Sequence, residues 1–206
     1  MSGMRSFRHV GAWLSASLLV LGTSLAAAAP PALSDPSPSG LARGFEAERG
    51  RWQSHERMLQ GYSAEGASVN LWRERGQLRK IELTALGERG RVLAEFYWRA
   101  GHLVSARERR MDYGRHLMEI PADQPTPMSV VQDDVIDYAG GLPRLWWRDG
   151  NPGQPRTAEA RSRARELGRL ADSLRRLGTL PPPAKGCEWQ CGTDWDTGRC
   201  ARFVCR

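Results

Sequence analysis

The feature that most constrains the fold is a run of short alternating segments between residues 62 and 150, each ending at a glycine-containing turn. ASVNLWR, QLRKIELTAL, VLAEFYWR and HLVSARERR alternate roughly between apolar and polar residues and are rich in Val, Ile, Leu, Tyr and Trp. They are separated by Arg75-Gly76, by GERG at 87–90 and by Ala100-Gly101. This strand–turn–strand spacing predicts an antiparallel β-meander.

An imperfect repeat within the run supports this prediction. LWRERGQLRKIEL (71–83), FYWRAGHLVSARE (96–108) and VIDYAGGLPRLWW (135–147) each contain an aromatic strand end, a glycine turn and a Leu in the next strand. One hairpin cannot bury its apolar face alone, so we predict a sheet of about five or six strands. Pro143 cannot donate to a β-ladder, which places the last hairpin at an edge. IPADQPTPMS (120–129) is expected to be irregular.

Two helices are predicted to flank these strands. LARGFEAERGRWQSHERMLQ places apolar residues at roughly helical intervals, which predicts a short amphipathic helix near 42–60 despite Gly44 and Gly50. TAEARSRARELGRLADSLRRLG carries Ala and Leu on one face and arginines mostly elsewhere, with Thr157 as N-cap and Gly178 at the end. Its length of about 30 Å would cover one face of the sheet. A membrane-surface helix is the alternative, but the apolar face lacks the usual aromatic residue.

The repeat is also similar to one found in a class of uncharacterised bacterial exported proteins, which join an aromatic strand, a turn and a Leu-led strand and end in a helix. The matching positions are Tyr97, Gly101 and Leu103, and Tyr138, Gly141 and Leu142. Arg or Ala replaces the turn Asn or Asp of that class, and the cysteine-rich tail is an addition. The resemblance covers about half of the chain. It implies an exported sheet-plus-helix domain and carries over no catalytic residue.

The first residues have the three-part pattern of a secretory signal peptide. Arg5 and Arg8 precede an apolar run from Gly11 to Leu25, and a row of alanines follows, which predicts cleavage near Ala28. The run is shorter than the ~20 residues of a membrane-spanning helix. No cysteine follows it to form a lipobox. We therefore expect a periplasmic or secreted protein without a transmembrane span.

Composition divides the chain into five parts. Residues 1–28 are the signal peptide, and the Pro/Ser-rich residues 29–40 are expected to be a disordered spacer. Residues 41–180 form the predicted α+β domain. The Pro-rich linker 181–186 is expected to hold the cysteine-rich tail, residues 187–206, away from that domain.

All four cysteines lie in this tail, with the spacing C-x3-C-x8-C-x4-C. Structural zinc sites usually show C-x2-C pairs, and clustered cysteines of an exported chain are typical of disulfides. If the DTG segment (196–198) is a hairpin tip, one bulge residue brings the cysteines opposite each other in nested pairs. We therefore predict the bridges Cys187–Cys205 and Cys191–Cys200, with no metal and no cofactor.

No catalytic residue is predicted. GYSAEG (61–66) is one residue longer than a nucleophile elbow and precedes a strand. DTG lacks the second copy that an aspartic protease requires. Asp133, Asp134 and Asp137 could act as acid and base or surround a cation, although solvated carboxylates are the commoner explanation.

The tail also contains the candidate binding residues. Trp189, Trp195 and Phe203 cannot all be buried within twenty residues, and Arg199 and Arg202 flank them. Exposed rings beside arginines suit stacking on a sugar or holding an anionic polymer. The equal alternative is a C-terminal clasp, in which the rings pack on the disulfides or on the main domain.

These observations predict a non-enzymatic binding module of the cell envelope. Its expected partner is a protein or an anionic glycan. The formal net charge is +7, but no run of five like charges occurs, and nucleic acid is not the expected partner. One alternative is an inhibitor or immunity-type protein of an envelope enzyme. The other is a small envelope hydrolase that uses the three aspartates.

Overall fold

The computed structural model describes residues 39–179, 186–191 and 200–206, without the side chain of Ala201. Every described residue belongs to one compact unit, residues 36–206. The predicted signal peptide, most of the spacer, all but the last residue of the linker and the DTG tip lie outside the described residues.

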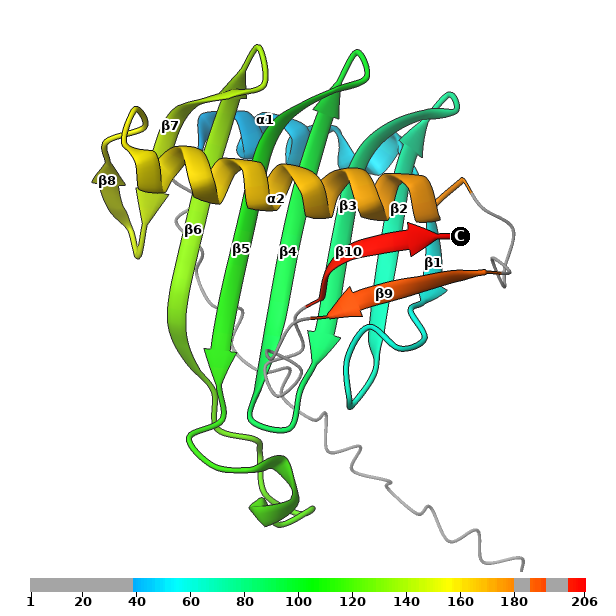
Figure 1. Cartoon of the computed structure of the whole chain (residues 1–206), viewed down its shortest axis with the longest axis vertical. Helices are drawn as coiled ribbons and strands as arrows, with labels where there is room; N and C mark the ends of the chain where they lie inside the picture. The colour runs from blue at the N-terminus through cyan, green and yellow to red at the C-terminus, as the bar shows by residue number, and fades with distance from the viewer. Residues whose placement is uncertain (1–38, 180–185, 192–199) are drawn as a thin grey trace, which may run out of the picture. The chain divides into compact units, whose positions relative to one another are not determined.

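Among the described residues, eight antiparallel strands form one sheet in which each strand pairs with its sequence neighbours (Figure 1). The strands are β1 (Gln53–Met58), β2 (Ala67–Glu74), β3 (Gln77–Leu86), β4 (Gly90–Arg99), β5 (His102–Asp112), β6 (Ser129–Ala139), β7 (Leu142–Arg148) and β8 (Asn151–Gly153). The predicted meander is confirmed, and the sheet is larger than the expected five or six strands. The three-residue β8 and the unpredicted β1 account for the difference.

The predicted helix at 42–60 is wrong in its second half. Helix α1 runs from Gly40 to Glu48, a 3-10 turn spans Arg49–Arg51, and β1 follows. Gly50 has a low helix propensity and lies in the 3-10 turn that follows the end of α1. All six β1 residues pair with β2, so this non-local ladder supplies the hydrogen bonds that a longer helix would have supplied.

The sequence repeat corresponds to a repeat of backbone geometry. Each of the hairpins β2–β3, β4–β5 and β6–β7 turns on two residues with positive φ, as a type I′ turn requires. These turn pairs are Arg75-Gly76, Ala100-Gly101 and Gly140-Gly141. In each hairpin the third residue of the returning strand is an extra, bulged residue. The bulged residues are Arg79, Val104 and Arg144.

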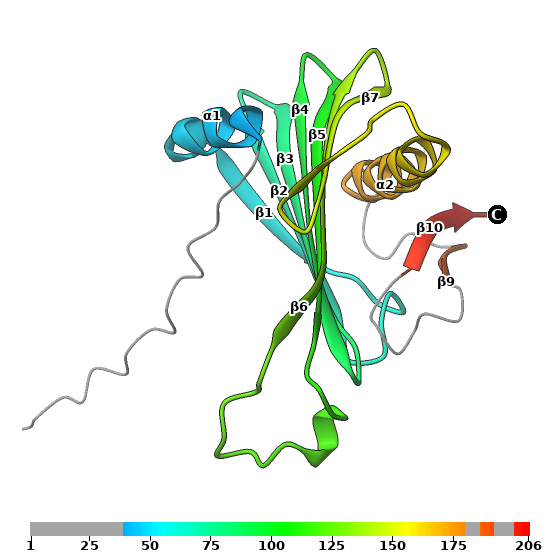
Figure 2. The ribbon, with the colours of Figure 1, turned by 90° about the vertical axis from the view of Figure 1, so that its left-hand side faces the viewer.

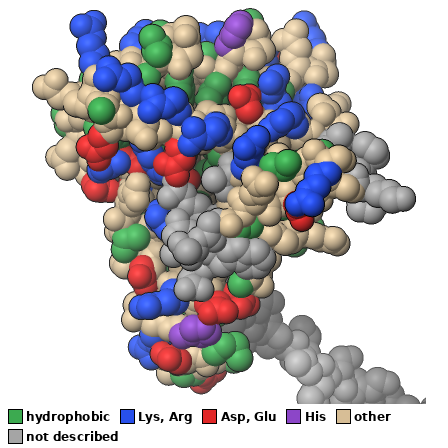
Figure 3. All heavy atoms as spheres, in the orientation of Figure 1, with side chains coloured by type: hydrophobic (Ala, Val, Ile, Leu, Met, Phe, Trp, Pro, Cys, Tyr) green, Lys and Arg blue, Asp and Glu red, His purple; other side chains and the backbone are tan. Residues whose placement is uncertain are grey.

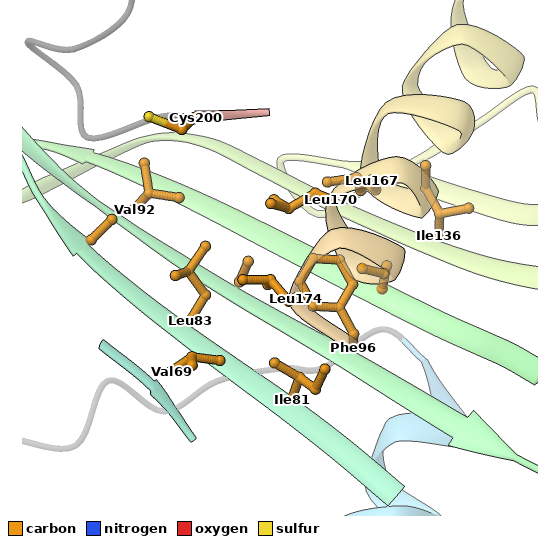
Figure 4. Packing of buried hydrophobic residues seen from close by; sticks show 14 of the residues in the cluster. Val69, Ile81, Leu83, Val92, Phe96, Ile136, Leu167, Leu170, Leu174 and Cys200 are labelled. Carbon is orange, nitrogen blue, oxygen red and sulfur yellow. The ribbon is translucent and has the colours of Figure 1, made fainter. Parts of the chain in front are cut away.

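Two helices lie on opposite faces of the sheet (Figure 2). Helix α2 (Ala158–Leu177) crosses one face, and α1 lies on the other. The hydroxyl of Thr157 caps α2 by accepting a hydrogen bond from the amide of Ala160 at 3.1 Å, as predicted. The buried face of α2 consists mainly of the predicted Ala and Leu residues. Figure 4 shows Leu167, Leu170 and Leu174 beside Phe96 and the aliphatic side chains of the strands, where the main core lies.

Pro143 lies at an edge of the sheet because the short strand β8 does not extend far enough to pair with it. Only Trp146, Trp147 and Arg148 of β7 pair with β8. At Pro143, β7 is therefore the outermost strand, and the missing amide hydrogen removes no ladder bond.

The tail forms a second, two-stranded antiparallel sheet from β9 (Cys187–Cys191) and β10 (Cys200–Cys205). Disulfides join Cys187 to Cys205 and Cys191 to Cys200, which is the nested arrangement. The register shifts once, between Cys200 and Arg202, so the ladder contains a single irregularity.

Candidate binding site

The tail packs against the main domain and does not stand apart from it. Cys200 is fully buried in the main core. The ring of Trp189 meets Tyr62 edge to face, with centroids 4.6 Å apart, and Phe203 lies 5.0 Å from Trp189. The amide of Phe203 donates to the hydroxyl of Ser173 in α2 at 3.4 Å. These contacts are those of a clasp.

The three predicted binding residues of the tail that the structure describes are therefore not gathered on one exposed surface. Phe203 is buried and Trp189 is half-buried, whereas Arg202 is exposed. Trp195 and Arg199 lie outside the described residues.

The three aspartates suggested for a hydrolase do not converge. Successive strand residues point to opposite faces, so Asp134 faces α2 while Asp133 and Asp137 face the side of α1. Arg107 donates two hydrogen bonds to Asp133, at 2.9 and 2.6 Å. Asp137 accepts hydrogen bonds at 2.8 and 2.7 Å from the hydroxyls of Ser39 and Ser105. Each carboxylate has separate donors, so the three do not form an acid–base pair.

Asp134 belongs to a buried ion cluster between α2 and the sheet. Arg163 of α2 donates to Asp134 at 2.8 Å and to Glu108 at 2.6 Å, and both acids are completely buried. Arg148 donates to Asp134 at 2.9 Å. Burial acts to raise the pKa of Asp134, but the hydrogen bond from Arg148 and the charge of Arg163 hold it below its ordinary value. The ionised cluster ties α2 to β5 and β6.

A second polar cluster, which sequence reasoning missed, lies between α1 and the sheet. The ammonium of Lys80 is 2.5 Å from Glu46 of α1 and 2.7 Å from each of Glu82 and Glu95. Lys80 is 1% exposed, and the hydroxyl of Tyr97 also donates to Glu46, at 2.9 Å. The three carboxylates are close enough together to hold a metal ion, but the ammonium takes that central position. We refer to these five residues as the Lys80 cluster.

The protonation of the Lys80 cluster indicates a structural role. Burial acts to lower the pKa of the Lys80 ammonium, but Glu95, Glu46 and Glu82 raise it above its ordinary value. Burial acts to raise the pKa of Glu46, but Lys80 and Tyr97 lower it. A protonated lysine with three carboxylate partners is no nucleophile. The sequence gives one indication that Lys80 is special, because lysine occurs in this chain only at positions 80 and 185.

The solvent face of α2 carries a row of exposed arginines, which we call the arginine row: Arg161, Arg165, Arg169 and Arg176. The row extends over sixteen positions, and the fifteen steps between its ends correspond to about 22 Å of helix. Within the described part of the chain, none of its members forms an ion pair. The acidic residue on the same side of the helix, Asp172, pairs with Arg175 at 3.4 Å. Figure 3 shows the resulting band of positive side chains.

The connection between β5 and β6 projects away from both helices (Figure 2). It was predicted to be irregular and contains one 3-10 turn, Leu117–Glu119. The amide of Leu117 donates to the carbonyl oxygen of Glu88 at 2.7 Å, which anchors the base of the projection. Its exposed apolar side chains, together with those at the start of β6, are Met118, Met128, Val130 and Val131.

Comparisons with protein-family models, curated proteins and solved structures give no significant match to this chain. Of the helices that the structure describes, none combines the length and the apolar character that crossing a membrane requires.

Proposed function

We propose that the protein is a non-enzymatic binding module that holds an acidic glycan along the arginine row of α2. The observation that carries this proposal is four exposed guanidinium groups on one side of a rigid helix. Arginine presents planar, bidentate donors that suit carboxylate, sulfate and phosphate groups. Because the helix is fixed on a sheet, its backbone loses little conformational entropy on binding, and the ordering cost falls on the arginine side chains.

The surroundings of the row favour a glycan over two other anionic partners. Single-stranded nucleic acid binding uses aromatic rings on which bases stack, and α2 contains no aromatic residue. A membrane-surface helix inserts its apolar side into lipid, whereas the apolar side of α2 is buried against the sheet. A row of charges about 22 Å long matches several units of an extended acidic chain.

The test uses the whole mature chain with polygalacturonate as the acidic polymer and dextran as the neutral one. The double variant Arg165→Gln with Arg169→Gln should weaken polygalacturonate binding about tenfold, the equivalent of ~1.4 kcal/mol for two exposed charge contacts. The affinity of the unaltered protein should also fall as salt is raised from 50 to 300 mM, because exposed charges are screened.

The matched control is Arg89→Gln with Arg115→Gln, two exposed arginines outside α2. It removes the same charge and should retain nearly the full affinity. Equal losses in the two double variants would show that only net charge matters. Comparable binding to dextran would exclude an acidic ligand.

A second candidate, an inhibitor-type protein, is favoured by the β5–β6 projection. An exposed apolar loop on a rigid scaffold is the usual form of a segment that enters an enzyme cleft. A photo-crosslinking residue at Met118 should then give a defined protein adduct in envelope extracts, and one at Arg202 should not. Adducts of the same pattern from both positions would contradict this candidate.

A further inference from the structure

A hollow lies beside the tip of each repeated hairpin. The hollow at the third hairpin, β6–β7, has a volume of about 440 Å³. The side chains that matter for its chemistry are Leu142, Pro143, Arg144, Pro155, Arg156 and Arg161. All the charged residues in this lining are arginines. The hollow lies at the N-terminal end of α2 and shares Arg161 with the arginine row.

The backbone places two of these arginines at the hollow. Arg144 is the bulged residue of β7, and a bulge redirects its side chain away from the regular alternation of the strand. Arg161 donates from its guanidinium to the carbonyl oxygen of Arg156 at 2.7 Å, which fixes one side of the rim. In the described residues, neither Arg144 nor Arg156 has an acidic partner.

The equivalent hollow at the first hairpin differs because acidic residues lie beside its arginines. It has a volume of about 390 Å³ and includes two glutamates in its lining. Arg79, the bulged residue that corresponds to Arg144, pairs with Glu74 at 2.6 Å. Arg51 pairs with Glu48 at 3.3 Å. In the first hollow, therefore, Arg51 and the bulged Arg79 have acidic partners, whereas within the described residues the arginines of the third hollow have none.

The third hollow also offers apolar surface. Leu142 is 66% exposed, and Ala139, Pro143 and Pro155 add to the apolar lining. Guanidinium groups beside proline and leucine suit a strongly anionic group attached to a ring with an apolar face. A sugar phosphate has both parts, with a phosphate that can accept several N–H bonds.

We infer that this hollow binds a phosphorylated sugar, the anionic end unit from which a glycan continues along α2. The continuation along α2 rests on the proposed function, whereas binding in the hollow is independent of it. The three arginines hold the phosphate, and Leu142 with the two prolines contacts the ring. A free sugar phosphate and a terminal unit of a longer chain present the same chemistry to the hollow.

The test measures binding of glucose 1-phosphate to the whole mature chain by calorimetry, with inorganic phosphate and glucose as partial probes. Glucose 1-phosphate should bind at least about tenfold more tightly than either partial probe, since each lacks one set of contacts. Arg144→Gln with Arg156→Gln should abolish most of this binding, while polygalacturonate affinity changes by no more than about twofold. Both residues are exposed, so the folded state should be retained.

The matched variants separate the two proposals. Arg165→Gln with Arg169→Gln should weaken polygalacturonate binding and leave glucose 1-phosphate binding intact. Loss of glucose 1-phosphate binding in this variant, or its persistence in Arg144→Gln with Arg156→Gln, would overturn the assignment of the hollow. Equal affinities for inorganic phosphate and glucose 1-phosphate would show that the sugar is not part of what the hollow recognises. If the unaltered protein binds glucose 1-phosphate but does not bind polygalacturonate, the row is refuted and the hollow stands.

Discussion

The two faces of the sheet are covered in different ways. Helix α2 has twenty residues, of which eight are buried, and the ion cluster at Arg163 is enclosed within that apolar layer. Helix α1 has nine residues and buries only Ala42 and Phe45 of its own. An isolated helix of that length is marginal in water, so it depends on tertiary contacts. The comparison teaches that a long helix can be held mainly by apolar area, whereas a short one needs specific polar anchors.

The largest effect should come from Arg163→Ala on the α2 face. This change removes the guanidinium that Glu108 and Asp134 share and leaves Arg148 as the cationic partner of Asp134, at an expected cost of about 3–5 kcal/mol in the free energy of unfolding. Urea unfolding measures the loss. The control, Arg165→Ala on the exposed side of the same helix, should change stability by less than about 0.5 kcal/mol. A loss below about 1 kcal/mol for Arg163→Ala would mean that water reaches the two acids.

Lys80→Met should cost less, about 2–3 kcal/mol, because the carboxylates left behind can be partly hydrated. The side chains of Glu46, Glu82 and Glu95 are 36%, 23% and 25% exposed. The loss should be concentrated in α1, so amide hydrogen exchange of residues 40–48 should accelerate more than exchange in α2. Equal acceleration in both helices would contradict the view that the Lys80 cluster anchors α1.

A glycine at the end of α2 and one inside α1 provide a sharper comparison. At Gly178 a β-carbon would overlap the side chain of Leu71 and lie 3.3 Å from the carbonyl oxygen of Arg175, so Gly178→Ala should cost about 1–3 kcal/mol. At Gly44 a β-carbon would meet no atom within 4 Å. Gly44→Ala should therefore stabilise the protein by up to about 1 kcal/mol through helix propensity. Thermal unfolding should show a lower melting temperature for Gly178→Ala and a higher one for Gly44→Ala.

The smallest effect is a difference in pH dependence between the faces. The pKa of Glu46 is lowered from 4.5, so its stabilising contribution is present above pH 4.5 and disappears as pH falls through the lower folded value. The pKa of Lys80 is raised from 10.5, so its contribution is complete below pH 10.5 and is lost as pH rises through the higher folded value. Burial acts to lower the pKa of Arg163, but Glu108 and Asp134 raise it above its ordinary value, so Arg163 stays charged throughout this range.

Hydrogen exchange at alkaline pH, corrected for the intrinsic rate, measures this difference. As pH rises above 10.5, α1 should lose protection before α2 does. Simultaneous loss of protection in both helices would show that the Lys80 cluster does not set the alkaline limit of the α1 face.

Local signals predicted most of the fold. The period of two, the glycine turns and the capped amphipathic helix are each readable within about twenty residues. β1 was missed because QSHERM has no apolar alternation, and five of its six residues are exposed. Its extended conformation depends on pairing with β2, and a local sequence pattern cannot show this pairing.

The candidate sites were harder to predict for the same reason. The Lys80 cluster combines residues 46, 80, 82, 95 and 97 from three elements, and no spacing in the sequence connects them. The cysteine spacing was enough to predict nested pairs. It could not indicate that Trp189 and Phe203 pack inward, because their neighbours Tyr62 and Ser173 are distant in sequence.

The order of elements along the chain has a consequence for biosynthesis. All eight strands of the main sheet precede α2, and each pairs only with a sequence neighbour. A ribosome therefore releases every partner that the meander requires before it releases the helix that covers the face with Phe96 and Ile136. Until residues 158–177 emerge, this partly made sheet has an uncovered apolar surface of the kind that promotes aggregation. Nascent chains stalled before residue 158 should consequently depend on chaperones more than the finished protein does.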